Sequence, residues 1–253
     1  MCTAIPRRTI INCQLYQRDK ALYIKALFSR IAPRYDLLNS IMTGFLHYRW
    51  KKRTVFEGTA QEIGIGLDIA SGTGDIAVEL GKSKNVTQVI ALDFAMPMLK
   101  LAQNRITQSR RISNIELQLA DALSLPFTDN CLTRVTTGFS LRNVVSVAGL
   151  FSETYRVLKP NGTFAILEAT PLKSTRWNKL FSWAFRFYFH HVVPFMGAVL
   201  ANDREAYTYL PRSVDNFYTP TELINMLQST GFSRVRYIPV GFGTTSILIA
   251  TKL

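Results

Sequence analysis

The chain has 253 residues, of which 47% are hydrophobic and 11% aromatic, and this composition excludes a disordered chain and suits one large core. Its formal net charge is +13. The three cysteines are odd in number and without CxxC spacing, which argues against a disulfide framework or a zinc site and predicts a reducing, cytoplasmic compartment.

The positive charge is concentrated at the beginning of the chain. Residues 1–60 hold eleven Lys and Arg against three acids, a balance of +8. An anionic membrane surface or a nucleic acid would be attracted to such a region, and a solvated basic helical face explains the charge equally well. The most membrane-like segment, 183–201, is interrupted by Arg186, His190, His191 and Pro194, so we do not predict a spanning helix.

The first elements are predicted to be helical. Residues 1–16 show no pattern and are expected to be irregular, whereas 18–31 carry an apolar stripe typical of an amphipathic helix that ends at Pro33. A second helix is predicted over about 40–55 and includes the aromatic and basic run 47–53. These residues form a helical N-terminal extension.

From residue 64 onward, strands and helices alternate. Strands are predicted at 65–70, 88–93, 115–119, 132–138 and 162–168, with helices at 75–82, 96–109 and 145–158 between them. After an aromatic-rich insertion, a helix over 220–230 precedes two strands, 234–240 and 246–252, whose short link makes them antiparallel. The pattern predicts an α/β fold with a doubly wound, mostly parallel, seven-stranded sheet and an antiparallel closing hairpin.

We expect one domain over residues 1–253. Its parts are the extension (1–60), a cofactor-binding core (61–168), an insertion that covers the substrate (169–218), and the closing helix and hairpin (219–253).

A glycine turn follows the first predicted strand. Gly72 and Gly74 lack a Cβ, so the backbone can turn sharply and approach a ligand, and the turn ends at a helix N-terminus, which favours an anionic or polar group. The spacing Gly72-x-Gly74-x-x-Ala77 also satisfies the dinucleotide fingerprint. A nicotinamide-dependent oxidoreductase therefore stays open at this point.

Carboxylates surround the turn and narrow the choice of ligand. Asp93 ends the second strand, where an acid can accept both ribose hydroxyls, and Asp121 beside Ala122 can accept the adenine amine with Phe94 as apolar cover. Asp68, at the end of the first strand, would suit a ligand ammonium. Because carboxylates repel a pyrophosphate, the residues favour adenosine with an amino-acid tail, as in S-adenosyl-L-methionine.

Several motifs resemble those of known methyltransferases. Residues 67–75, Asp93 and Asp121-Ala122 are similar to the cofactor motifs of class I S-adenosylmethionine methyltransferases, which have a Rossmann-like fold. Residues 28–39, 125–127, 139–144 and 156–162, with the insertion motifs at 188–197 and 207–213, resemble the ubiquinone/menaquinone C-methyltransferase family. The chain departs from that family at Ser71, at Gly138 and in its last strand, which lacks a His.

The resemblance implies which residues bind and what they bind. Thr73, Asp93, Asp121 and Ala122 would contact the cofactor, together with Asp68, Gly72, Gly74 and Phe94 of the turn and strand ends. The substrate would be a polyprenylated quinol, demethylmenaquinol being preferred to a benzoquinol, held by Tyr35, Asn39, Arg142, Tyr188 and Tyr207.

A ring carbon becomes nucleophilic when the adjacent phenol loses its proton, so the site needs a base or an anion stabiliser. Arg142 with Asn143 could stabilise the quinolate oxygen, and His190 or its neighbour His191 could accept the proton. A structural ion pair remains the alternative for Arg142, and an ordinary packed imidazole for each His.

A lipid-soluble substrate predicts peripheral contact with the inner face of the membrane through the basic N-terminal region. A homodimer is left open, and no nucleic-acid partner is expected. The alternative from another class is an RNA-binding methyltransferase-like protein, suggested by the charge and by the run 47–53; the oxidoreductase ranks third.

Overall fold

The computed structural model describes residues 7–109, 113–172 and 179–253. Within them, seven strands form one sheet in the order β3-β2-β1-β4-β5-β7-β6. The strands are β1 (Gly64–Ile69), β2 (Val86–Asp93), β3 (Ile115–Leu119), β4 (Leu132–Gly138), β5 (Leu158–Ala169), β6 (Phe232–Val240) and β7 (Thr245–Lys252). Strands β1 to β5 pair in parallel, while β7 runs antiparallel to both β5 and β6. The predicted fold class is confirmed.

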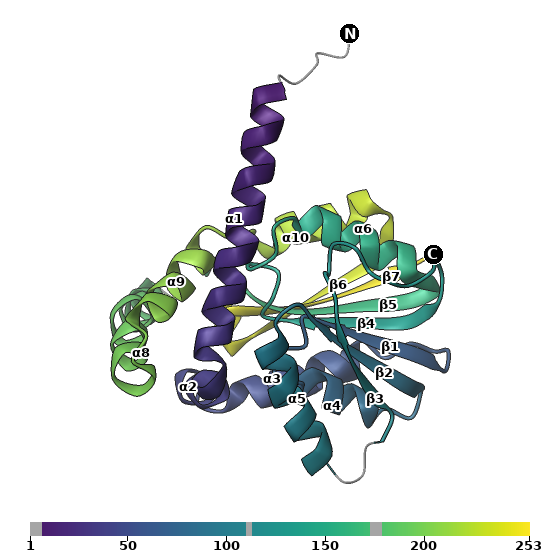
Figure 1. Ribbon diagram of the computed structural model, residues 1–253, viewed down its shortest axis with the longest axis horizontal. Coiled ribbons are helices and arrows are strands. Elements are labelled where there is room, and N and C mark those ends of the chain that lie inside the picture. Colours follow the sequence, from purple (N-terminus) through teal and green to yellow (C-terminus); the bar gives the residue numbers. More distant parts are fainter. Residues whose placement is uncertain (1–6, 110–112, 173–178) are drawn as a thin grey trace.

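Helices cover both faces of this sheet (Figure 1). On one face lie α6 (Val147–Val157) and α10 (Pro220–Thr230), and on the other lie α3 (Leu46–Glu57), α4 (Asp75–Gly81) and α5 (Met96–Gln108). The larger core forms under α6 and α10 around Phe151, Phe164 and Leu227. A smaller core under α4 includes Leu80 and Val89. Burial on both faces explains the apolar runs within β2, β5 and β7.

The remaining helices gather at the end of the sheet where the parallel strands finish (Figure 1). They are α1 (Arg7–Ile31), α2 (Tyr35–Met42), α7 (Lys179–Phe187), α8 (Val193–Ala201) and α9 (Arg204–Asp215). A π-helical turn, Tyr188–Val192, joins α7 to α8. Leu27 and Leu38 from the N-terminal helices share a core cluster with Val193 and Tyr207 from the insertion. The extension and the insertion therefore build one wall at the ligand-binding edge.

Two expectations about the N-terminal helices were wrong. The segment expected to be irregular is helical from Arg7, and Figure 1 shows the first part of α1 extending beyond the body. The single helix expected over 40–55 is two helices. Gly44 (φ 55°) and Phe45 (φ 63°) adopt left-handed conformations between them, which ends α2 and turns the chain into α3.

Candidate functional site

Two adjoining cavities lie among the described residues, beyond the ends of the parallel strands. The smaller one, of about 230 Å³, borders the glycine turn, and the larger one, of about 630 Å³, lies under the insertion. Phe28, Tyr35, Phe139 and Asn143 line both. A group bound in one cavity would therefore face a group bound in the other.

The backbone of the glycine turn is shaped by Asp93. Its carboxylate accepts a hydrogen bond from the Gly72 amide (2.8 Å) and another from the Ala95 amide (2.9 Å). Gly72 (φ 56°) and Gly74 (φ 83°) both adopt the left-handed conformation that a Cβ would strain. Burial raises the pKa of Asp93, and the hydrogen bonds from these backbone amides oppose that rise.

The smaller cavity contains most of the predicted cofactor residues. Gly72, Asp93, Phe94, Asp121 and Ala122 line it. Asp68, Thr73 and Gly74 do not. The cavity wall thus comes from the turn, the end of β2 and the segment after β3, as the sequence predicts for an adenosine ligand. Of the other three residues, Thr73 and Gly74 belong to the turn without lining the cavity, and Asp68 lies in β1.

Asp68 is buried at the end of β1, beneath the turn. Its Oδ1 accepts a hydrogen bond from the Thr136 hydroxyl (2.8 Å), and its Oδ2 has no partner among the residues that the structure describes. Burial raises the pKa of Asp68 to about 7. An acid in this position is stabilised when a positive charge approaches, because a cation favours its ionised form.

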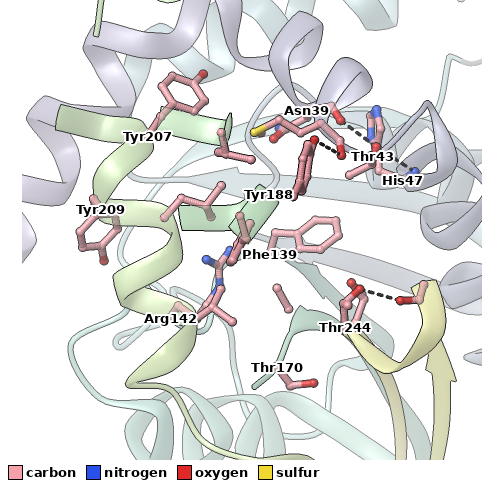
Figure 2. A pocket seen from close by; sticks show the side chains of 18 of the residues that line it. Asn39, Thr43, His47, Phe139, Arg142, Thr170, Tyr188, Tyr207, Tyr209 and Thr244 are labelled. Carbon is pink, nitrogen blue, oxygen red and sulfur yellow. Dashed lines mark hydrogen bonds between the residues drawn. The ribbon is translucent and has the colours of Figure 1, made fainter. Parts of the chain in front are cut away.

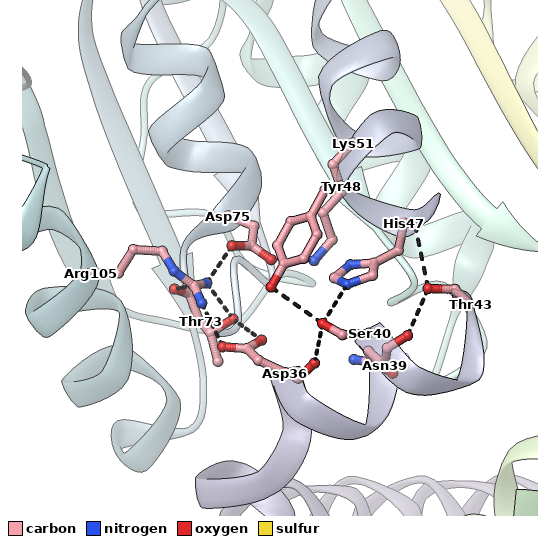
Figure 3. A network of polar contacts seen from close by, with 10 residues as sticks. All are labelled: Asp36, Asn39, Ser40, Thr43, His47, Tyr48, Lys51, Thr73, Asp75 and Arg105. Atoms are coloured by element: carbon pink, nitrogen blue, oxygen red, sulfur yellow. Dashed lines mark hydrogen bonds and ion pairs between the residues drawn. The ribbon is translucent and has the colours of Figure 1, made fainter. Parts of the chain in front are cut away.

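Thr73 takes part in a network of polar contacts that joins the turn to three helices (Figure 3). Its hydroxyl donates to Asp36 of α2 (2.8 Å) and accepts from Arg105 of α5 (2.8 Å). Arg105 also pairs with Asp36 (2.6 Å) and Asp75 (2.5 Å), and Lys51 of α3 pairs with Asp75 (2.5 Å). The network fixes the walls of the larger cavity, to which α2 and α3 contribute, against the turn that borders the smaller one.

Helix α1 covers the smaller cavity. The sequence predicted the helix but not this role. Ala21, Ile24, Lys25 and Phe28 line it. The Lys20 ammonium anchors the helix by donating to the Val144 carbonyl oxygen (2.8 Å). The apolar stripe predicted for this helix was Leu22, Leu27 and Ile31. Leu27 and Ile31 are buried, but Leu22 is exposed and none of the three lines this cavity, so the pattern did not predict the face that covers it.

The larger cavity brings together all the predicted substrate-binding and catalytic residues except His191, which does not line it. Tyr35, Asn39, Arg142, Asn143, Tyr188, His190 and Tyr207 line it. Figure 2 shows several of them around the same space, with Arg142 and Phe139 on one side and Asn39, Tyr188 and His47 on another. Aromatic rings supply much of the remaining wall: Phe28, Trp50, Phe139, Phe185, Phe189, Tyr209 and Phe242.

Arg142 is held by a buried ion pair. Its Nε donates to Glu168 Oε1 (2.7 Å), and its Nη1 donates to the Ser213 hydroxyl (3.1 Å). The Glu168 side chain is fully buried and also accepts a hydrogen bond from the Ala169 amide (2.9 Å). Glu168 was missed because it ends a predicted strand, at a position where the sequence gives no sign of its partner. The guanidinium is both structurally paired and part of the cavity wall.

Neighbouring side chains orient the other polar groups of this cavity. The Tyr209 hydroxyl donates to Asn143 Oδ1 (3.2 Å), and His190 Nε2 lies 3.0 Å from Asp215 Oδ2. Burial raises the pKa of Tyr35 to about 12, and burial also raises the pKa of Tyr207. Both phenols are therefore neutral hydrogen-bonding groups near neutral pH.

Two kinds of feature are absent from the residues that the structure describes. Among the described residues, no group of three or more His, Cys, Asp or Glu side chains is arranged to hold a metal ion. Within the same residues, no helix is both long and apolar enough to cross a bilayer.

The comparisons with known proteins agree with the geometry. The model of the ubiE/COQ5 methyltransferase family matches residues 16–252. A demethylmenaquinone methyltransferase from Roseiflexus sp. (strain RS-1) is 39% identical over 238 residues, covering 92% of this chain and 94% of the relative. A ubiquinone/menaquinone biosynthesis C-methyltransferase from Dinoroseobacter shibae is 33% identical, covering 93% of this chain and 92% of that one.

A solved structure extends the likeness to the fold. The SAM-dependent methyltransferase from Aquifex aeolicus has a TM-score of 0.56 over 80% of this chain and 89% of its own, with 18% sequence identity. At that identity the likeness concerns the fold alone. The sequence relatives are named as methyltransferases, so they favour neither the oxidoreductase nor the RNA-binding alternative.

Proposed function

The chain belongs to the ubiE/COQ5 methyltransferase family, and we propose that it methylates a ring carbon of a polyprenylated quinol with S-adenosyl-L-methionine as donor. Demethylmenaquinol is the preferred substrate, in keeping with the name of the 39% identical relative. The observation that carries the proposal is the junction of the two cavities at Tyr35, Phe139 and Asn143. It provides a donor site and an acceptor site that open into one another.

The smaller cavity fits the donor in its arrangement of polar groups. Asp93 and Asp121 lie where acids can accept hydrogen bonds from a ribose and from an adenine amine, and Ala122, Phe94 and Met98 give apolar cover. A dinucleotide would bring its pyrophosphate to the glycine turn, which Asp68 and Asp75 bracket in the sequence. When bound, the donor supplies a methyl group on a positively charged sulfur, and the partly protonated Asp68 beneath the turn gains from a nearby positive charge.

The larger cavity fits a planar, apolar ring. Its walls are rich in aromatic side chains, and Arg142 is a buried cation in them, with its charge balanced by Glu168. A quinol oxygen beside this guanidinium would lose its proton more readily, because a cation stabilises the anion that makes the neighbouring carbon nucleophilic. Asn143, held by Tyr209, can donate its amide N–H to the same oxygen.

His190 is the group that we assign to proton removal. Its Nε2 lies 3.0 Å from Asp215 Oδ2, a contact that would hold the ring in one orientation. The π-helical turn that carries it, Tyr188–Val192, is a local geometry often found at functional sites. Solvent reaches the imidazole, which is 34% exposed, so the proton can leave the cavity.

We also propose a peripheral contact with the inner face of the membrane. The basic N-terminal region would attract anionic headgroups, and helices α7 and α8 add exposed apolar side chains in Trp183 and Phe195, each 67% exposed. Flotation with vesicles of phosphatidylglycerol and phosphatidylcholine at low salt tests it. Protein that stays at the bottom of the gradient would exclude this contact without affecting the proposed reaction.

The reaction is tested with purified protein, methyl-labelled S-adenosyl-L-methionine and a short-chain demethylmenaquinone reduced by dithionite. We expect label in the ring by mass spectrometry. The unreduced quinone, which has no hydroxyl group, should remain unlabelled. In cells lacking the protein, the demethylated quinone should accumulate. An unchanged quinone pool, together with protein that binds the donor but labels no quinol, would refute the proposed function.

A further inference from the structure

His47 places a polar atom without a hydrogen-bond partner among the described residues in the wall of the larger cavity. His47 lies in the first turn of α3, and its ring borders this cavity with Thr43, Leu46 and Lys51 (Figure 2). The side chain is 1% exposed. Its Nδ1 forms no hydrogen bond with any residue that the structure describes.

The contacts of the other ring nitrogen determine the tautomer. His47 Nε2 lies 3.1 Å from the Ser40 hydroxyl (Figure 3). Ser40 has a single hydrogen, which it donates to the Asp36 carbonyl oxygen (2.7 Å), a group that can only accept. Ser40 must therefore accept from His47, so Nε2 carries the proton. Nδ1 is left as a bare acceptor.

The imidazole is also kept neutral. Burial, and next the positive charge of Lys51 one turn along the helix, lower the pKa of His47 to about 4. The Lys51 ammonium is itself held in place by Asp75. Near neutral pH, Nδ1 can therefore accept a hydrogen bond but does not retain a proton, and this distinguishes His47 from a general base.

An unsatisfied acceptor at this depth needs an explanation. Leaving a buried polar group without a partner costs about 1–3 kcal/mol, and such groups are few in native proteins. An apolar side chain at position 47 would avoid this cost. The presence of a histidine is explained if a ligand supplies the missing hydrogen-bond donor. The cavity that the ring borders is where such a ligand would bind.

We propose that His47 Nδ1 accepts a hydrogen bond from a hydroxyl group of the aromatic substrate and so sets the orientation of the ring. The inference rests on the proposed function for the identity of the hydroxyl compound. A quinol carries two hydroxyl groups on opposite sides of its ring. One beside Arg142 becomes the anion, and the other, bound by His47, stays protonated and fixes which ring carbon faces the smaller cavity.

Two substitutions separate the ring nitrogens. His47→Gln places an amide near the position of Nε2, which keeps the contact with Ser40 and removes the acceptor at Nδ1. His47→Asn places its amide oxygen near Nδ1 and abandons Ser40. We expect H47Q to raise the KM for the reduced demethylmenaquinone, and its Kd, about fivefold to tenfold, the value of one neutral hydrogen bond, with unchanged affinity for the donor. H47N should stay within about twofold of the wild type for both ligands.

Binding without turnover, with S-adenosylhomocysteine in the donor site, completes the test. The wild type should bind the naphthohydroquinone more tightly than the monohydroxy analogue that lacks the hydroxyl facing His47, and H47Q should lose this preference. If H47Q does not fold, as judged by thermal unfolding, His47→Met replaces it. Equal affinities of wild type and H47Q, or equal losses in H47Q and H47N, would overturn the proposal. A wild type that binds the hydroquinone but never methylates it refutes the proposed function and not the role of His47.

Discussion

The buried pair between Arg142 and Glu168 supports a quantitative prediction. Both side chains are almost completely covered, 4% and 0% exposed, and the Nε–Oε1 distance is 2.7 Å. Glu168→Gln keeps the shape of the side chain and an oxygen that can still accept from the Ala169 amide. It removes the negative charge, so Arg142 Nε is left with a neutral oxygen as its acceptor. The buried guanidinium then has only neutral hydrogen bonds, to this oxygen and to the Ser213 hydroxyl, among the described residues.

The cost follows from that geometry. Removing one partner of a buried ion pair costs about 3–5 kcal/mol, because the charge left behind is uncompensated. The retained amide contact offsets part of this loss, so we expect Glu168→Gln to lower the free energy of unfolding by about 3 kcal/mol. The kcat/KM should fall about a hundredfold, since the guanidinium that faces the substrate loses Glu168, the charged partner that orients it.

Urea denaturation and steady-state kinetics measure the two effects. The matched control is Glu79→Gln, which breaks the exposed pair with Lys82 and should cost less than about 1 kcal/mol. The double substitution Arg142→Met with Glu168→Leu should recover much of the stability but no activity, because two packed apolar side chains replace a buried pair at little cost. A loss below about 1 kcal/mol in Glu168→Gln, or an active double variant, would refute the reasoning.

Three further outcomes are expected. Asp93→Ala removes the acceptor for the Gly72 and Ala95 amides and should weaken binding of S-adenosyl-L-methionine at least about tenfold by calorimetry; unchanged affinity would contradict the assigned role. Gly197→Ala places a Cβ 2.4 Å from Tyr207, so it should destabilise the protein by about 1–3 kcal/mol and raise the KM for the quinol. The folded-state pKa of Asp68, about 7, lies above that of an unfolded Asp, so the folded protein binds more protons and stability should fall as pH rises from about 4 to 7. Asp68→Asn should flatten this fall in urea titrations at pH 5 and pH 8, and parallel curves would show that Asp68 is not its source.

The parts of the fold that could be predicted from the sequence depend on local pattern. The bounds predicted for β3 and β4 match the structure, because each is a short run of suitable residues between clear breaks. The glycine turn and the acids after β2 and β3 follow from topology, since parallel strands end at the same edge. The split between α2 and α3 falls at Gly44, a residue that weakens a helix interior, and the prediction of one helix over 40–55 did not take it into account.

The rest depended on contacts between residues far apart in the sequence. Thr73 was expected at the cofactor, and its hydroxyl instead meets Asp36, 37 positions away. Glu168 and Asp215, which orient Arg142 and His190, had no motif of their own. Ser40 and His47 are only 7 positions apart, yet their contact requires the break at Gly44. Such pairs become visible only when the chain is folded.

The two cavities are built from different parts of the fold, and this difference explains which part determines the substrate specificity. The smaller cavity is built largely from the strand ends and the turn, a framework shared with a structure of 18% sequence identity. The larger cavity takes its walls from α1 to α3, the insertion and the turn before β7. Because the network of Asp36, Lys51, Thr73, Asp75 and Arg105 ties α2 and α3 to the glycine turn, a change in those helices acts on both cavities. Substitutions in α2 and α3 that change the substrate specificity must therefore also preserve the glycine turn that borders the donor site.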